Sequence, residues 1–146
     1  MNNLKNVILL ISLARIAWID GKSKRITNKS LGILLLIRLF FLFIEAIEQT
    51  KSLKLLMAEA WFGFLIGGGI FFLCYCLGKK AMGAGDVKLM AVLGSYLGGE
   101  KILWTTFYAA VYELAYILWK KEEKSSFAPF VFAGVLTVLI WKNPLP

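Results

Sequence analysis

Residues 55–77 read LLMAEAWFGFLIGGGIFFLCYCL and contain a single charged side chain, that of Glu59. About 20 apolar residues suffice for an α-helix to cross the hydrocarbon core of a bilayer. Similar apolar stretches occupy residues 4–19, 31–47, 87–97, 102–119 and 127–141. The stretch 87–97 covers only about half of a bilayer at roughly 1.5 Å per residue. The pattern predicts an all-α, polytopic membrane helix bundle with about six transmembrane helices.

The composition supports the same fold class. The chain has 146 residues, and 59% of them are hydrophobic, against about 45–50% in soluble proteins. A chain of this length has no soluble core large enough to bury the excess. We therefore interpret residues 1–146 as a single integral-membrane domain.

The net charge of +8 follows the predicted loops. Nine Lys and Arg residues fall in the loops at 20–30, 78–86 and 120–126, and five fall near the two chain ends and in the loops at 48–54 and 98–101. The positive-inside rule places the richer set in the cytoplasm and both termini on the extracytoplasmic side. No basic surface remains for nucleic acid, so the expected partner of these charges is the lipid bilayer.

The residue types that are missing exclude several kinds of site. The chain has no histidine, which excludes Ser-His-Asp and Cys-His catalysis and His-ligated metals. Cys74 and Cys76 are too close in sequence to share a helix face and lack the second pair of a zinc site. We interpret them as small apolar helix residues, and we expect no metal and no cofactor.

Two isolated aspartates flank predicted membrane spans. Asp86 follows Gly83-Ala84-Gly85, and Asp20 opens a polar loop, residues 20–30, at the end of the first apolar stretch. An ionisable side chain beside membrane helices is costly and marks a functional site by default. The predicted topology places both carboxyl groups at the cytoplasmic face. Two such groups suggest hydrolysis by an aspartyl pair that shares one proton.

These residues resemble the motifs of the type IV prepilin peptidases, a family of membrane aspartyl proteases. The segment Gly83–Leu89 matches the family's Gly-x-Gly-Asp-x-Lys-hydrophobic motif. The family's first aspartate is followed, seven and eight residues on, by Pro-Asn or Pro-Asp; Asp20 is followed by Thr27 and Asn28, so the proline is replaced. A third landmark, at the entry to the last helix, appears as Ser126–Phe130 and has also lost its first proline.

The resemblance implies a role for each matching residue. Asp20 and Asp86 would be the catalytic pair, in the cytoplasmic (inner) membrane, with the active site on the cytoplasmic side. The motif-supporting residues would be Gly83, Gly85, Lys88 and Asn28. The implied substrate is a type IV pilin-like precursor whose short basic leader is removed. Longer members carry a loop with two Cys-x-x-Cys pairs for methyl transfer; nothing here corresponds, so we expect a peptidase-only form without a cofactor.

The sequence also suggests local roles around the two carboxyl groups. Gly83 and Gly85 permit unusual backbone conformations and a close approach of substrate. Lys88 would lie on the helix face away from Asp86 and pair with a neighbouring helix or with lipid headgroups. Asp20 would follow a helix C-terminus and Asp86 would precede an N-terminus, so the helix dipoles favour a protonated Asp20 and an ionised Asp86.

Other interpretations remain open from the sequence. Asp86 could be a helix N-cap, and Asp20 an ordinary loop carboxyl. Arg38 and Glu45, seven residues apart, could satisfy helix contacts. The main rival function is a non-enzymatic membrane protein, such as a small transporter, an assembly factor or an inactive peptidase relative. A presenilin-type protease is a second rival, although those proteins have a Tyr-Asp pair where this chain has Ile19.

Overall fold

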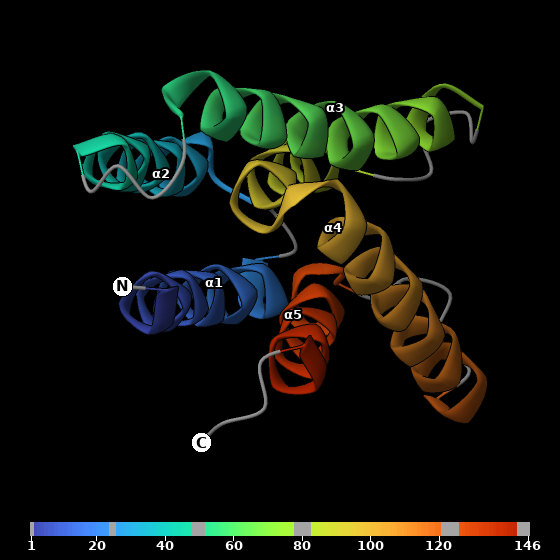
Figure 1. Cartoon of the computed structure of the whole chain (residues 1–146). Helices are drawn as coiled ribbons and strands as arrows, with labels where there is room; N and C mark the ends of the chain where they lie inside the picture. The colour runs from blue at the N-terminus through green and yellow to red at the C-terminus, as the bar shows by residue number, and fades with distance from the viewer. Residues whose placement is uncertain (1, 24–25, 48–51, 78–82, 121–125, 143–146) are drawn as a thin grey trace. The chain divides into compact units, whose positions relative to one another are not determined.

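The computed structural model describes residues 2–23, 26–47, 52–77, 83–120 and 126–142. Within these ranges it contains five α-helices and no strand: α1 (Asn2–Ser23), α2 (Asn28–Ile47), α3 (Leu53–Leu77), α4 (Ala84–Lys120) and α5 (Ala128–Lys142), all drawn in Figure 1. The all-α prediction is confirmed for the described residues. The predicted turn at Gly78-Lys79-Lys80, the loop residues Lys24 and Arg25, and most of the charged loop 120–126 lie outside them.

The predicted count of six helices is not confirmed. The fourth and fifth predicted stretches both belong to α4, which is broken at Gly98, where φ is 77° and ψ is 171°. Glycine adopts this backbone conformation readily because it has no Cβ. We call residues 84–97 the first arm of α4 and residues 99–120 the second arm. Three of the described helices, α2, α3 and α4, are long and apolar enough to cross a membrane, and α5 is apolar but shorter.

The first helix is longer than its apolar stretch. The sequence suggested a loop over residues 20–30, but α1 continues to Ser23, whose hydroxyl donates a hydrogen bond to the Ile19 carbonyl at 2.8 Å. The next helix already begins at Asn28. The prediction that Asp20 follows the helix is therefore wrong, because Asp20 lies inside the last turns of α1.

The chain forms two compact units, which are described separately: residues 1–26 with 104–146, and residues 27–103. In the first unit, α1 and α5 pack against each other (Figure 1). Their fully or almost fully buried residues recur every three or four positions on one face of each helix. These are Leu9, Leu13 and Ile16 on α1, and Ala128, Val131, Val135 and Val138 on α5. Asp20, four residues after Ile16, continues the buried stripe of α1.

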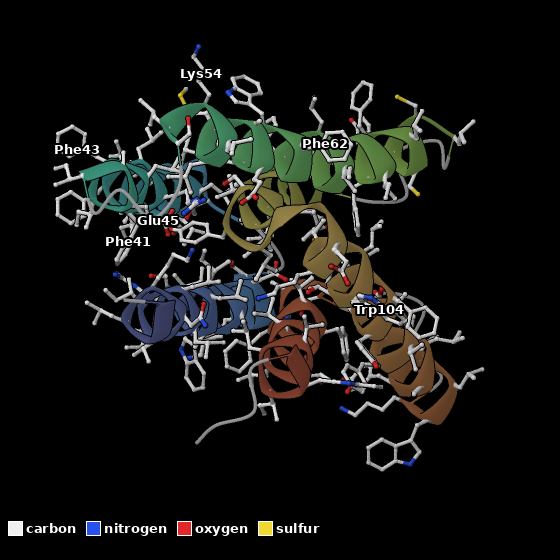
Figure 2. All side chains as sticks on the ribbon, viewed as in Figure 1. Phe41, Phe43, Glu45, Lys54, Phe62 and Trp104 are labelled. Atoms are coloured by element: carbon white, nitrogen blue, oxygen red, sulfur yellow. The ribbon has the colours of Figure 1, made fainter. Side chains whose placement is uncertain are left out.

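In the second unit, the first arm of α4 packs against both α2 and α3 (Figure 1). Residues 89–96 of this arm are all buried, as expected for a helix that is apolar on every side. Each of the two covering helices presents one buried stripe to this arm. The stripe on α2 consists of Leu31, Leu34, Arg38 and Phe41, and the stripe on α3 consists of Leu56, Ala60, Gly63, Gly67 and Phe71. Large apolar side chains such as Phe43, which points away from the ribbon in Figure 2, remain exposed. A lipid environment would cover them.

Helices α3 and α4 cross at glycines. A Cβ atom added to Gly63 would overlap the carbonyl of Gly94, and a Cβ atom on Gly94 would overlap the carbonyl of Gly63. A Cβ atom on Gly67 would likewise overlap the carbonyl of Met90. Small residues let the backbones of membrane helices approach closely. The close packing of the first arm against α3 therefore depends on these glycines.

Gly63→Ala is expected to destabilise the protein, because the added methyl group meets a backbone atom that cannot rotate away. The cost of overpacking is about 1–3 kcal/mol and occasionally more. Thermal unfolding in detergent measures it. Gly69→Ala, on the same helix, is the matched control, since a Cβ atom there meets nothing within 4 Å. Equal melting temperatures for the two variants would contradict the proposed crossing.

Candidate functional site

Asp86 lies in the first turn of α4. The helix begins at Ala84, and the Asp86 amide donates a hydrogen bond to the Gly83 carbonyl at 3.0 Å. Gly83 therefore occupies the cap position, and the interpretation of Asp86 as the N-cap is wrong. Asp86 is the third residue of the helix, where the partial positive charge of the N-terminus still favours an ionised carboxylate.

The two motif glycines differ in their surroundings. A Cβ atom on Gly83 would lie 3.1 Å from Oδ2 of Asp86, so a side chain at this position would press on the carboxyl group. Gly85 is helical and does not have a positive φ angle, so the unusual backbone conformation suggested for it is not observed. The feature of Gly83 that the structure explains is its small size beside Asp86.

Lys88 contacts the neighbouring helix, as the sequence analysis suggested. Its Nζ atom donates a hydrogen bond to Oδ1 of Asn28, the first residue of α2, at 3.2 Å. Both residues belong to motifs that the sequence places 60 positions apart. The hydrogen bond therefore joins the beginning of α2 to the first turns of α4, immediately after Asp86.

Two further hydrogen bonds join the same pair of helices. The Tyr96 hydroxyl donates to the Leu34 carbonyl, and Nε of Arg38 donates to the Ser95 carbonyl, both at 2.8 Å. The later residues of α2 contact the later residues of the first arm, so the two helices run in the same direction. Their N-termini consequently lie at the same end of the unit, the end that carries Asp86.

Arg38 is the centre of a buried polar cluster. It is only 5% exposed, and its Nη1 atom lies 3.3 Å from Oε2 of Glu45, which is labelled in Figure 2. Its guanidinium group also lies 5.5 Å from the ring centre of Tyr96. Ser95 precedes the break at Gly98, and the last carbonyls of a helix lack partners within the helix. Arg38 satisfies one of them and places a positive charge at a negative helix end, so the prediction that Arg38 and Glu45 satisfy helix contacts is confirmed.

Asp20 is buried, with 4% of its surface exposed. Its Oδ2 atom accepts a hydrogen bond from the amide of Ala128, the first residue of α5, at 3.2 Å. Asp20 is therefore not an ordinary loop carboxyl. Burial raises the pKa of Asp20 above its usual value, and the hydrogen bond from Ala128 partly opposes this shift. The direction agrees with a protonated Asp20, but the main cause is desolvation and not the helix dipole.

The structure brings some of the predicted site residues together within each unit. In the first unit, Asp20 contacts Ala128 of the landmark at 126–130. In the second unit, Lys88, two residues after Asp86 in the chain, contacts Asn28. A meeting of Asp20 with Asp86 remains a prediction, because the two residues belong to different units.

Sequence reasoning missed the backbone groups that orient these side chains. The Ala128 amide and the Ser95 carbonyl are backbone groups, which do not depend on the type of side chain, so no sequence motif reveals them. One signal was available: the apolar spacing of Leu9, Leu13 and Ile16 places Asp20 on the same helix face. In the described residues, no three His, Cys, Asp or Glu side chains gather closely enough to hold a metal ion.

Comparison with protein families gives one match. The profile of the type IV leader peptidase family matches residues 7–118, more than half of the chain. The chain belongs to the type IV leader peptidase family. The matched region contains Asp20, Asn28 and the whole segment Gly83–Lys88. Comparisons with curated proteins and with solved structures gave no match.

Family membership and the helices together define the class of protein. Members are peptidases, of the aspartic type in this family. Three helices of the described chain are long and apolar enough to cross a bilayer. The protein is therefore a membrane protein of a peptidase family, as the sequence motifs indicated.

Proposed function

We propose that this leader peptidase family member is an aspartic endopeptidase of the cytoplasmic membrane. It removes the short basic leader of a type IV pilin-like precursor at the cytoplasmic face, and Asp20 and Asp86 form its catalytic pair. The observation that carries the proposal is the family match, which spans both aspartates. The surroundings of the two residues support different roles for them.

The proposed chemistry needs one ionised and one protonated carboxyl group. The ionised group takes a proton from water, and the protonated group polarises the scissile carbonyl. Asp86, in the first turn of α4, is favoured as the ionised base. Asp20, whose pKa is raised by burial, is favoured as the protonated partner. Two close carboxyl groups titrate as a coupled pair, so these roles describe the resting state of the pair.

The neighbouring residues would serve the pair by fixing its surroundings. The Asn28–Lys88 hydrogen bond holds the helix start that carries Asp86. The absence of a side chain at Gly83 leaves room beside the carboxyl group for water and for an extended substrate. The Ala128 amide holds the Asp20 carboxyl by one oxygen, which leaves the other oxygen available to a substrate carbonyl.

Co-expression with a tagged pilin-like precursor tests the proposal. Mass spectrometry of the precursor would show a single cut at the junction of the basic leader and the apolar segment. The matched control is the chain in which both aspartates are changed to asparagine. Precursor that stays intact with the wild-type chain at normal abundance would contradict the endopeptidase and favour a non-enzymatic assembly role.

A further inference from the structure

The second unit contains an apolar groove that α2, α3 and the first arm of α4 form together. Its volume is about 430 Å³, within the range of small-ligand pockets. Small residues of all three helices line it, and larger apolar side chains flank them. The small residues are Gly32, Gly68 and Ala91, and the larger ones include Leu35, Phe64 and Phe72. The groove lies wholly within residues 27–103, so it belongs to one compact unit.

The groove is open to the environment that surrounds the helices. Leu35 is 37% exposed and Phe72 is 57% exposed. The three helices that form the groove are also the three that are long and apolar enough to span a bilayer. A bilayer around these helices would place lipid chains at the open side of the groove, from which an occupant can enter.

The dimensions of the groove fit a single flexible chain. On α2 the groove extends from Asn28 to Leu35, which is roughly 10 Å at about 1.5 Å per residue. A volume of about 430 Å³ over roughly 10 Å corresponds to a cross-section of about 40 Å². An α-helix with its side chains is about 10 Å across and needs roughly twice that area. A whole helix is therefore too wide to enter the groove.

An extended polypeptide would fit the groove by width but not by chemistry. The walls consist of apolar side chains and helical backbone whose hydrogen bonds are made within each helix. The N–H and C=O groups of an extended chain would find no partners along such walls, which is costly in a membrane. A hydrocarbon chain carries no such groups. The walls therefore favour the acyl chain of a lipid.

One end of the groove carries polar donors and a positive charge. Asn28 and Lys88 line this end, and Nζ of Lys88 donates a hydrogen bond to Oδ1 of Asn28 at 3.2 Å. The Lys88 ammonium group keeps two further N–H donors, and the Asn28 amide group has two of its own. Both residues are exposed, so a lipid headgroup can reach these donors.

Other charges at this end also favour an anion. Because α2 and the first arm of α4 run in the same direction, the partial positive charges of both helix N-termini lie here. Lys29, the second residue of α2, adds a further cation, and the first turn of α2 has no acidic residue. The first turn of α4 contains Asp86, but helix periodicity places it on the face opposite Lys88 and Ala91. The carboxyl group of Asp86 therefore does not occupy the groove.

We propose that this groove binds one anionic glycerophospholipid. One acyl chain lies along the apolar walls, and the phosphate group accepts hydrogen bonds from Lys88 and Asn28. Basic pockets between membrane helices on the cytoplasmic side bind anionic headgroups, and the sequence predicts that α2 and α4 begin on that side. The bound lipid joins α2, α3 and α4, and its binding does not depend on peptidase activity.

Native mass spectrometry of the purified chain tests the proposal. The chain is released from micelles that contain phosphatidylglycerol or phosphatidylcholine with identical acyl chains, so that only the headgroup differs. We expect the wild-type chain to retain one phosphatidylglycerol more tightly than phosphatidylcholine. Lys88→Gln should weaken phosphatidylglycerol binding about fivefold, the contribution of one basic residue near an anionic lipid, and leave phosphatidylcholine binding unchanged. Equal affinities of the wild-type chain for the two lipids would overturn the proposal.

Lys54→Gln is the matched control for charge. Lys54, which is labelled in Figure 2, is an exposed lysine at the start of α3 and does not line the groove. This variant should bind phosphatidylglycerol like the wild-type chain. If Lys54→Gln and Lys88→Gln weakened binding equally, the lipid would respond to net charge alone and the site would be wrong.

Gly32→Phe tests the acyl-chain part of the site. A Cβ atom on Gly32 meets nothing within 4 Å, so the variant should fold normally and its ring should occupy the groove. Thermal unfolding in lipid-free detergent verifies the fold. We expect the tightly bound phosphatidylglycerol to be lost. Gly69→Phe, on α3 outside the groove and also with open space around its Cβ position, should keep it. Retention of the lipid by Gly32→Phe would contradict the proposal.

Photolabelling locates the lipid in the unaltered chain. Phosphatidylglycerol with a diazirine in its acyl chain should label Leu35 and Phe72 more strongly than Leu39 and Phe62, which are 53% and 65% exposed but lie outside the groove. The same label on phosphatidylcholine should show a weaker preference for the groove. Labelling by phosphatidylglycerol that follows exposure alone would overturn the site, whether or not the chain is a peptidase.

Discussion

Asp86→Asn is expected to lower the rate of leader removal by about 10²–10⁴-fold, the usual contribution of a general acid or base. Asparagine keeps the size of the side chain but cannot take a proton from water. Asp20→Asn should cause a loss of the same order, because the protonated partner is also removed. Single-turnover cleavage of a purified precursor in liposomes, at equal enzyme concentrations, measures both effects. Full activity of either variant would refute the pair.

The Asp20→Asn variant should remain folded, which makes its loss of activity informative. The amide oxygen of asparagine can still accept the hydrogen bond from Ala128. The raised pKa of Asp20 means that its contribution to stability is present at low pH and is lost as pH rises through that pKa. A neutral asparagine avoids this loss, so the variant should unfold at neutral pH no earlier than the wild-type protein.

Coupling between the two carboxyl groups gives a further check on the same variant. A nearby negative charge raises the pKa of a carboxyl group. Removing the Asp20 carboxyl should therefore lower the apparent pKa of Asp86, or leave it unchanged if Asp20 is fully protonated. A rise in that pKa would show that the assumed like-charge coupling is wrong.

Arg38→Met is expected to be strongly destabilising. It removes an ion-pair contact of Glu45, whose side chain is 12% exposed, and the donor to the Ser95 carbonyl. Breaking one side of a buried ion pair costs about 3–5 kcal/mol, because the remaining buried charge loses the attraction of the opposite charge. Chemical unfolding in detergent micelles measures the loss.

The double variant Arg38→Met with Glu45→Leu separates charge from packing. Replacing both partners of a buried pair by apolar residues is often neutral, so the double variant should regain most of the lost stability. The part that is not regained reports the hydrogen bond to Ser95. If the single and double variants were equally unstable, the ion pair would not explain the effect of Arg38.

The helical fold could be predicted from apolar run lengths, but the helix boundaries could not. The runs located all five described helices, because about 20 apolar residues have few alternatives to a membrane helix. The apolar runs failed at Asp20, where the helix continues beyond its apolar stretch and the Asp20 carboxyl group accepts a hydrogen bond from the Ala128 amide of α5. The apolar runs also failed to predict the break at Gly98. A pair of glycines followed by charged residues is typical both of a turn between two helices and of a break within one helix.

The candidate site could be predicted as a set of residues but not as an arrangement. The motifs indicated Asp20, Asp86, Asn28 and Lys88 as candidates, because the family resemblance assigns roles to residues at these positions. From the sequence, Lys88 could be expected to pair either with a neighbouring helix or with lipid headgroups, so its contact with Asn28 was only one of two options. The contact of Asp20 with Ala128 involves a backbone amide, which has no residue preference. Such contacts follow from tertiary packing and not from any local pattern.

Catalysis by the proposed pair requires that Asp20 and Asp86 meet at one hydrolytic water. Site-directed crosslinking in native membranes tests it most directly, using Asp20→Cys with Asp86→Cys in a chain whose Cys74 and Cys76 are replaced by serine. The pair Asp20→Cys with Ala128→Cys is the positive control, since the parent residues are in hydrogen-bond contact. We predict that a short thiol-bridging reagent links positions 20 and 86 within one chain. Crosslinking of the control pair alone, with none between positions 20 and 86 by the same short reagent, would contradict a shared hydrolytic water.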